Sequence, residues 1–135
     1  MAKSWKQKLD GGQPAHVEVL SKPFGGAPEG AKMLVATPRM VDDYIRRIPA
    51  GESRTVAQMR TDLARAHGAD ISCPISTSIF ARIAAEAALE EAETGKSLSE
   101  VTPFWRVIDE ASPIAKKLSC GLDLVRTQRA QEASA

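Results

Sequence analysis

Apolar side chains recur at helical spacing after Thr37-Pro38, and they define the first helix that the chain predicts. A hydroxyl cap followed by proline in the first turn is typical of a helix start. The apolar positions that follow are Met40, Val41, Tyr44, Ile45 and Ile48. Pro49 cannot continue the helix, so Pro49-Ala50-Gly51 is interpreted as a turn.

Two further helices are predicted downstream, joined by a short loop. Thr55 and Gln58 form a capping-box pattern at the start of a helix over residues 56–67. A longer helix is predicted over residues 76–94, with residues 68–74 as the loop before it. Two helices in this arrangement resemble a helix-turn-helix element, although many small helical domains contain such a pair.

The longer helix is expected to have an apolar stripe and an acidic outer side. The stripe comprises Ile79, Phe80, Ile83, Ala84 and Ala87. The outer positions are Glu86, Glu90, Glu91 and Glu93. Gly95 is a suitable C-terminal stop for this helix.

The N-terminal segment differs in composition from the helical region. Residues 1–36 are rich in glycine and proline and contain two strand-like pieces, at residues 16–20 and 33–36. They predict an arm or a small hairpin packed on a domain that covers residues 37–135.

The C-terminal third contains shorter elements. Residues 105–108 predict a short strand, which would supply a wing after the two helices. Ser112-Pro113 predicts a helical turn that ends before Gly121, and residues 122–131 predict a last helix.

Composition and charge narrow the class of protein. The 135 residues carry a formal net charge of +1, with 43% hydrophobic and 26% charged residues, as in an ordinary globular domain. This balance excludes nucleic-acid binding by bulk charge but leaves a local basic face open. No apolar run is long enough to span a bilayer, and the first residues lack a signal peptide's apolar stretch, so we expect a cytoplasmic protein with no membrane partner. Cys73 and Cys120 are then expected to be reduced thiols.

Two short motifs resemble those of one protein family. Residues 103–108, Pro-Phe-Trp-Arg-Val-Ile, resemble the Pro-Cys-His-Arg-Val-Ile signature of the alkylguanine-DNA alkyltransferases, repair proteins that take an alkyl group onto a cysteine. Residues 48–55 resemble the family's Ile-Pro-x-Gly-x-Val-x-Thr stretch at the same spacing. The resemblance spans about residues 38–110 and implies an α-rich α+β fold with a winged helix-turn-helix core.

The same motifs depart from the family at the residues that carry its chemistry. Phe104 stands in place of the nucleophilic cysteine and Trp105 in place of its activating histidine, and a phenyl ring cannot form a thiolate. Val56 replaces the family's DNA-rotating tyrosine, and the chain contains no asparagine. We therefore expect no catalytic residue and no cofactor. Alkyltransferase-like proteins, which also lack the cysteine, retain a base-binding pocket and flag lesions for other repair proteins.

Each candidate site residue has a functional and a structural interpretation. Phe104 and Trp105 could form a wall that stacks on a flipped base, or they could belong to the core. Arg106 could bind phosphate, or it could hold loops together through backbone carbonyls. We treat Phe104, Trp105 and Arg106 as the candidate pocket, with the structural interpretation favoured for all three.

A second candidate set lies at the start of the longer helix. Ser76, Thr77, Ser78 and Arg82 could contact DNA phosphates, although a plain helix cap is favoured. Six arginines crowd the two preceding helices and could form a phosphate-binding face, but acidic residues interleave with them and favour a mixed-charge surface. They are Arg39, Arg46, Arg47, Arg54, Arg60 and Arg65. His67, Asp70 and Cys73 are too few for a structural metal site, so no metal is predicted.

Two functions from different classes follow. The first is a non-catalytic alkyltransferase-like protein that binds duplex DNA in repair. The second is a scaffold or protein-interaction domain that kept the fold and lost the DNA surface. An unrelated small enzyme is disfavoured because no nucleophile–base pair is visible. A continuous positive face around residues 76–82 would favour DNA, and a neutral or acidic face would favour a protein partner.

Overall fold

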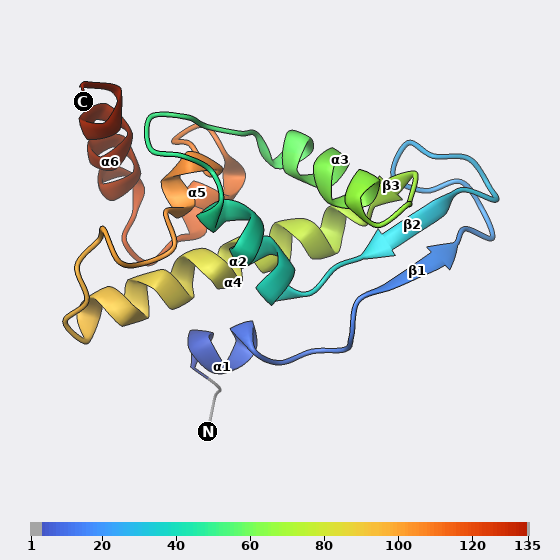
Figure 1. The fold of residues 1–135 in the computed structure, drawn as a ribbon, viewed down its shortest axis with the longest axis horizontal. Coiled ribbons are helices and arrows are strands. Elements are labelled where there is room, and N and C mark those ends of the chain that lie inside the picture. The colour runs from blue at the N-terminus through green and yellow to red at the C-terminus, as the bar shows by residue number, and fades with distance from the viewer. Residues whose placement is uncertain (1–3, 135) are drawn as a thin grey trace.

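The computed structural model describes residues 4–134 and shows an α+β fold in which helices predominate (Figure 1). The α-rich α+β class expected from the sequence is therefore confirmed. In chain order the elements are α1 (Trp5–Leu9), β1 (His16–Val19), β2 (Lys32–Val35), α2 (Pro38–Arg46), α3 (Val56–Ala66), β3 (Ile71–Ser72), α4 (Pro74–Glu93), the 3₁₀-helix η1 (Phe104–Arg106), α5 (Pro113–Lys117) and α6 (Leu122–Ser134). None of the helices within residues 4–134 is long and apolar enough to cross a membrane.

Helix α4 runs through the middle of the fold, and α1, α2 and η1 pack against it (Figure 1). Its buried face consists mainly of alanines, whose small side chains allow neighbouring backbones to approach closely. They are Ala81, Ala84, Ala85, Ala87 and Ala88. The core around them contains Val41 and Ile45 of α2, Met59 and Leu63 of α3, and Val125 of α6.

The predicted faces of α4 are wrong at two positions. Ile79, expected to face inward, is exposed, and Glu86, expected on the outer side, is buried. Glu86 is satisfied there because its Oε1 accepts hydrogen bonds from the Ser119 amide at 3.2 Å and hydroxyl at 2.6 Å. The alanine row therefore determines which face of α4 is buried, and the larger Ile79 points away from it.

The N-terminal hairpin forms as predicted, and a third strand joins it. Strands β1 and β2 pair antiparallel, and β3 pairs parallel with β2. The loop expected over residues 68–74 thus contains a strand, anchored by hydrogen bonds from the Asp70 amide to the Lys32 carbonyl and from the Cys73 amide to the Leu34 carbonyl. These contacts tie the N-terminal segment to the helical part of the chain. They do not test the boundary at residues 36/37, which stays a prediction.

The capping residues predicted for α2 and α3 form the hydrogen bonds expected of helix caps. The Thr37 hydroxyl accepts from the Met40 amide, and Thr55 and Gln58 form both bonds of the capping box. Helix α4 begins at Pro74, two residues before the predicted start, because proline suits its first turn and Cys73 occupies the cap position. Helix α5 forms after Ser112 as expected.

The segment expected to form a strand at residues 105–108 does not do so. It begins with η1, in which the amides of Val107 and Ile108 both bond to the Phe104 carbonyl. The backbone therefore turns back on itself instead of extending along a neighbouring strand. Among the described residues, every strand lies before α4, so the predicted wing after the helix pair is absent from this position.

A buried carboxylate connects α2 to the segment before η1. The side chain of Asp42 is buried and accepts a hydrogen bond of 2.6 Å from the Thr102 hydroxyl. Arg46 donates to the same carboxylate at 3.0 Å, which compensates its charge. This connection fixes the segment before η1 relative to α2.

Candidate functional site

The two aromatic residues of the motif lie in the core. Phe104 is 0% exposed and Trp105 is 3% exposed. Their rings meet edge to face, with centroids 5.3 Å apart and planes at 73°. The position that resembles the family's nucleophile is therefore closed to solvent and packed against α4.

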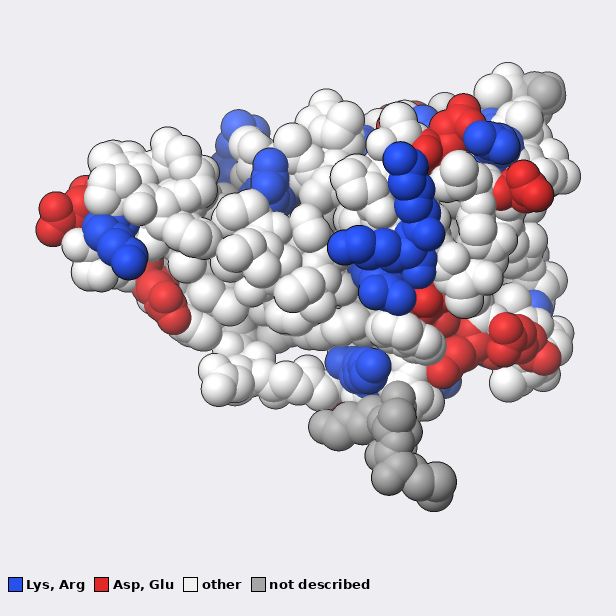
Figure 2. All heavy atoms as spheres, turned by 180° about the vertical axis from the view of Figure 1, so that it is seen from behind, with Lys and Arg blue, Asp and Glu red and all other residues white. Residues whose placement is uncertain are grey.

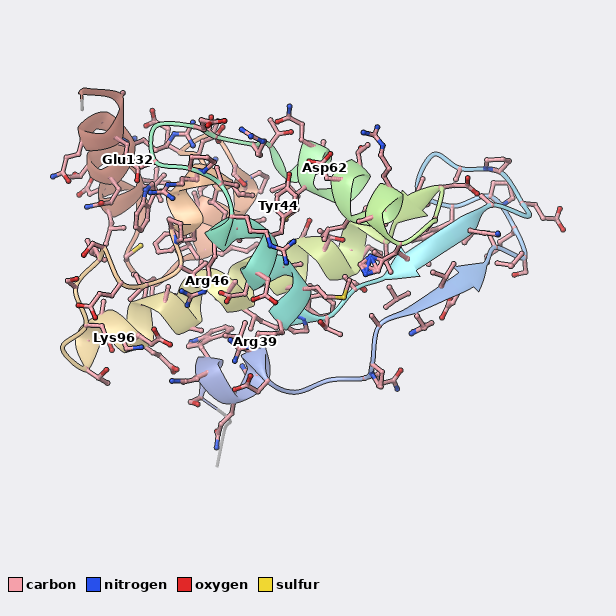
Figure 3. The ribbon with its side chains drawn as sticks, in the orientation of Figure 1. Arg39, Tyr44, Arg46, Asp62, Lys96 and Glu132 are labelled. Atoms are coloured by element: carbon pink, nitrogen blue, oxygen red, sulfur yellow. The ribbon has the colours of Figure 1, made fainter. Side chains whose placement is uncertain are left out.

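Glu132 of α6, labelled in Figure 3, accepts hydrogen bonds from two residues of the motif. Its Oε2 accepts a hydrogen bond of 2.8 Å from Trp105 Nε1 and one of 2.9 Å from Arg106 Nη2. Arg106 Nε lies 3.0 Å from Oε1, and the Gly51 amide donates to the same oxygen at 3.4 Å. One carboxylate therefore joins η1, α6 and the turn before α3.

Arg106 and Arg129 hold the surrounding loops through backbone carbonyls. Arg106 Nη1 donates to the Ile48 carbonyl at 2.6 Å, and Arg129 Nη1 donates to the Trp105 carbonyl at 2.7 Å. The Arg54 amide also bonds to the Arg106 carbonyl at 2.8 Å. Of the two interpretations of Arg106, these contacts support the loop-holding one, because its guanidinium is already occupied by Glu132 and Ile48.

The protonation of Glu132 reflects this network. Burial disfavours its charged form, but hydrogen bonds from Arg106, Trp105 and Gly51 outweigh burial and lower the pKa of this carboxyl below its ordinary value. Sequence reasoning misses this role, because the last helix is predicted to end at residue 131 and Glu132 lies 26 residues after Arg106. A lone glutamate near a chain end carries no local signal of such a partner.

A hollow of about 430 Å³ lies beside this network, between α6 and the turn before α3. Its lining contains three arginines and three glutamates, so the charges are equal in number. They are Arg106, Arg126, Arg129, Glu52, Glu110 and Glu132. Arg126 is paired with Glu110, and the indole N–H of Trp105 is already bonded to Glu132. With only 3% of Trp105 exposed, the hollow offers no aromatic face on which a base could stack.

A second hollow, of about 560 Å³, lies between α2 and α3. Tyr44 and Asp62 lie next to each other there (Figure 3), and the Tyr44 hydroxyl donates to Asp62 at 2.5 Å. Burial and this hydrogen bond raise the pKa of Tyr44 above its ordinary range. The phenol is therefore held as a neutral donor to the carboxylate.

The candidate DNA-contacting residues at the start of α4 differ in how far they are buried. Thr77 is buried, and its hydroxyl donates to the Cys73 carbonyl at 2.7 Å. Ser76 and Ser78 are half-buried. The prominent exposed side chains of these turns are Ile75, at 60%, and Ile79, at 53%. The exposed surface at the start of α4 is therefore largely apolar.

Arg82, the fourth candidate, is held by the N-terminal helix. Its guanidinium lies over the Trp5 ring, 5.4 Å from the centroid, and its Nη2 is 3.8 Å from Glu86. Its Nε is buried and has no hydrogen-bond partner among residues 4–134. Helix α1 is fixed in place by Glu90, which accepts from the Trp5 amide at 2.9 Å and the Lys6 amide at 3.0 Å. The sequence did not reveal that α1 packs on α4 and contacts this arginine, whose side chain is 38% exposed.

The six arginines around α2 and α3 divide into two groups. Arg39, Arg46 and Arg54 form ion pairs, with Asp10, Asp42 and Glu52 respectively. Arg47, Arg60 and Arg65 form no ion pair with any described residue. Figure 2 shows the opposite face of the molecule, where several basic side chains form one group with acidic side chains close to it, and other basic side chains lie apart.

The remaining polar candidates do not converge. The ring of His67 contacts the Leu63 carbonyl, Asp70 accepts from the Lys32 amide, and Cys73 lies at the start of α4. Within residues 4–134, no three His, Cys, Asp or Glu side chains are grouped so that they could hold a metal ion. Burial raises the pKa of the Cys120 thiol, which disfavours the reactive thiolate.

No protein-family model matches the chain, and neither does any curated protein or solved structure. The function has to be inferred from the residues and their geometry.

Proposed function

We propose that this chain is a non-catalytic relative of the alkyltransferases whose fold serves as a protein-interaction domain. The loss of chemistry is supported by Phe104, which is buried at the position that resembles the nucleophile. It is supported further by Glu132, which uses Trp105 and Arg106 as hydrogen-bond donors and joins them to α6. In this proposal the former reaction centre is part of the core.

Helices α3 and α4 are the proposed helix-turn-helix pair. They follow the Ile-Pro-x-Gly turn and the capping box that resemble the family, and residues 67–73 connect them. In this pair α4 holds the place of a recognition helix, whose first turns would enter a DNA groove. The chemistry of those turns therefore decides between a DNA and a protein partner.

The observation that carries the proposal is the apolar, uncharged start of α4. Residues 74–81 include no charged side chain, while Ile75 and Ile79 are 60% and 53% exposed. DNA affinity depends largely on cations that neutralise phosphates, and the first cation of α4, Arg82, is held by Trp5 and Glu86. Exposed isoleucines one turn apart are suited to an apolar groove on another protein.

DNA binding remains the second candidate because α3 carries unpaired cations. Arg60 and Arg65 form no ion pair with any described residue. Arg60 also lines a hollow of about 170 Å³ together with Pro74, the first residue of α4. A duplex that contacted α3 more than α4 would use these guanidinium groups for phosphates.

A titration with labelled oligonucleotides tests the choice. At about 50 mM salt we expect no duplex, single strand or O-alkylguanine duplex to bind with a Kd tighter than roughly 10⁻⁴ M, because the first turns of α4 carry no charge and Arg82 is held by Trp5 and Glu86. Fluorescence anisotropy measures this directly. Tighter binding that weakens with salt and is lost in Arg60→Glu, but not in the matched variant Arg126→Glu on α6, would overturn the proposal in favour of DNA.

A further inference from the structure

The outer edge of β1 is open. Among the described residues, the strand order is β1–β2–β3, so β1 has a neighbour on one side only. The opposite edge is different, because β3 has two residues and lies against α3. Val17 and Val19 of β1 are 43% and 68% exposed, although valine normally occurs in strands that are covered on at least one face.

The backbone groups that face outward on this edge can be identified from the register. The Leu20 amide donates to the Ala31 carbonyl at 2.9 Å, which places Leu20 at a hydrogen-bonded position of the β1–β2 pair. Such positions alternate along an antiparallel pair, so His16 and Glu18 also direct their amides and carbonyls toward β2. The amides and carbonyls of Val17 and Val19 therefore point away from the sheet, toward solvent.

We propose that β1 is a homodimer interface, at which a second copy of this chain adds its own β1 in antiparallel orientation across a two-fold axis. Strand addition at an open edge satisfies the outward backbone groups of both chains and joins the two sheets into one. It also covers part of the exposed valine side chains. This inference is independent of the proposed function and goes beyond it.

Charge complementarity selects one register among those that the backbone allows. Outward-facing residues must pair with outward-facing residues, so the axis can pass through His16, Val17 or Glu18. An axis at Glu18 places the two Glu18 carboxylates opposite each other, and an axis at His16 opposes the two imidazoles. An axis at Val17 places His16 opposite Glu18 of the second copy, twice, at the closely spaced non-hydrogen-bonded pairs.

The side chains on this edge are already arranged for such pairing. His16 Nε2 lies 2.8 Å from Glu18 Oε1 within one strand, so both groups lie on the same face of β1. In the dimer the two imidazoles of His16 and the two carboxylates of Glu18 would form a cluster in which the two kinds of group alternate. Strand β1 also lacks the lysine and proline with which natural edge strands commonly prevent pairing. A second copy is therefore the occupant that this edge fits.

Sedimentation of purified full-length protein tests the dimer. We expect a reversible monomer–dimer equilibrium with a dissociation constant below about 1 mM. Val17→Pro removes the outward amide at the axis without removing a bond to β2, and it should give a monomer. Glu18→Lys should weaken the dimer by about tenfold, because it opposes Lys to His16 in both pairs. Glu29→Lys, the same charge change in the turn between β1 and β2, should leave the equilibrium unchanged.

A charge exchange makes the test specific for the register and does not depend on the fold of the proline variant. The double variant His16→Glu/Glu18→His keeps opposite charges across the axis and should dimerise like the unmodified chain, whereas His16→Glu alone should not. Circular dichroism at each concentration checks that the variants stay folded. A chain that is monomeric at all concentrations, or a dimer insensitive to Val17→Pro and to the charge variants, would overturn the proposal.

Discussion

Replacing Phe104 by alanine is expected to destabilise the protein by about 3–5 kcal/mol, as for other buried phenylalanines. The ring is 0% exposed and packs edge to face against Trp105, so its loss leaves a cavity in the middle of the core. Urea unfolding followed by circular dichroism measures the change. Phe104→Leu fills most of the space, so its free energy of unfolding should fall considerably less.

The matched control is Phe80→Ala, because Phe80 of α4 is only half-buried. It should be destabilised by clearly less than Phe104→Ala. If the two variants lost equal stability, or if Phe104→Ala lost less than about 1 kcal/mol, residue 104 would lie in an open pocket and not in the core.

Replacing Glu132 by glutamine is expected to lower the free energy of unfolding by about 2–3 kcal/mol. The amide oxygen can still accept from Trp105 Nε1 and Arg106 Nη2, but the amide nitrogen that replaces Oε1 cannot accept from Arg106 Nε or from the Gly51 amide, and the guanidinium loses its counter-charge. The same urea titration reports the loss. Near-UV circular dichroism should also change, because the indole N–H of Trp105 then bonds to a neutral amide oxygen in place of a carboxylate.

The effect of this substitution depends on pH. The pKa of Glu132 is lowered in the folded protein, so its stabilisation is complete above the ordinary value of 4.5 and is lost as the pH falls through the lower folded value. The unmodified chain should therefore lose stability in acid more steeply than Glu132→Gln. Glu93→Gln, at an exposed position of α4, is the control and should keep the steep acid dependence. Parallel curves for Glu132→Gln and the unmodified chain would contradict the network.

The features that the sequence predicted well are those encoded within a few residues. The hydroxyl of Thr37 and the pair Thr55–Gln58 form their caps with residues three positions away. The antiparallel pair β1–β2 likewise joins strand-like pieces separated by a glycine- and proline-rich turn. Such local contacts leave a pattern in the sequence that does not depend on the rest of the fold.

The features that the sequence missed depend on distant partners. Glu90 holds the amides of α1 across 85 and 84 residues, and Glu132 reaches the Gly51 amide across 81 residues. Strand β3 has only two residues and exists because β2 lies beside it. The buried Glu86 looked like part of an acidic surface, since only the position of Ser119 makes its burial favourable.

In the candidate site, too, the local features could be predicted and the features that depend on distant partners could not. Phe104 could be excluded as a nucleophile from its side chain alone, and its place in the core agrees with the structural interpretation that we favoured. The surface at the start of α4 could not be judged from the sequence, because Ile79 is predicted to belong to the inward-facing apolar stripe and is exposed instead. The exposure of Ile75 and Ile79 became apparent only once the alanine face of α4 was located against α2 and η1.

We propose that the start of α4 contacts a protein and not DNA, and site-specific photo-cross-linking in cells can identify what it contacts. A photoreactive amino acid in place of Ile79 reports what touches this exposed position, and the same group in place of Glu93, near the other end of α4, reports chance contacts. We predict adducts with another protein at position 79 that exceed those at position 93, and no adducts with nucleic acid. Nucleic-acid adducts at position 79, or equal adducts at both positions, would contradict the claim.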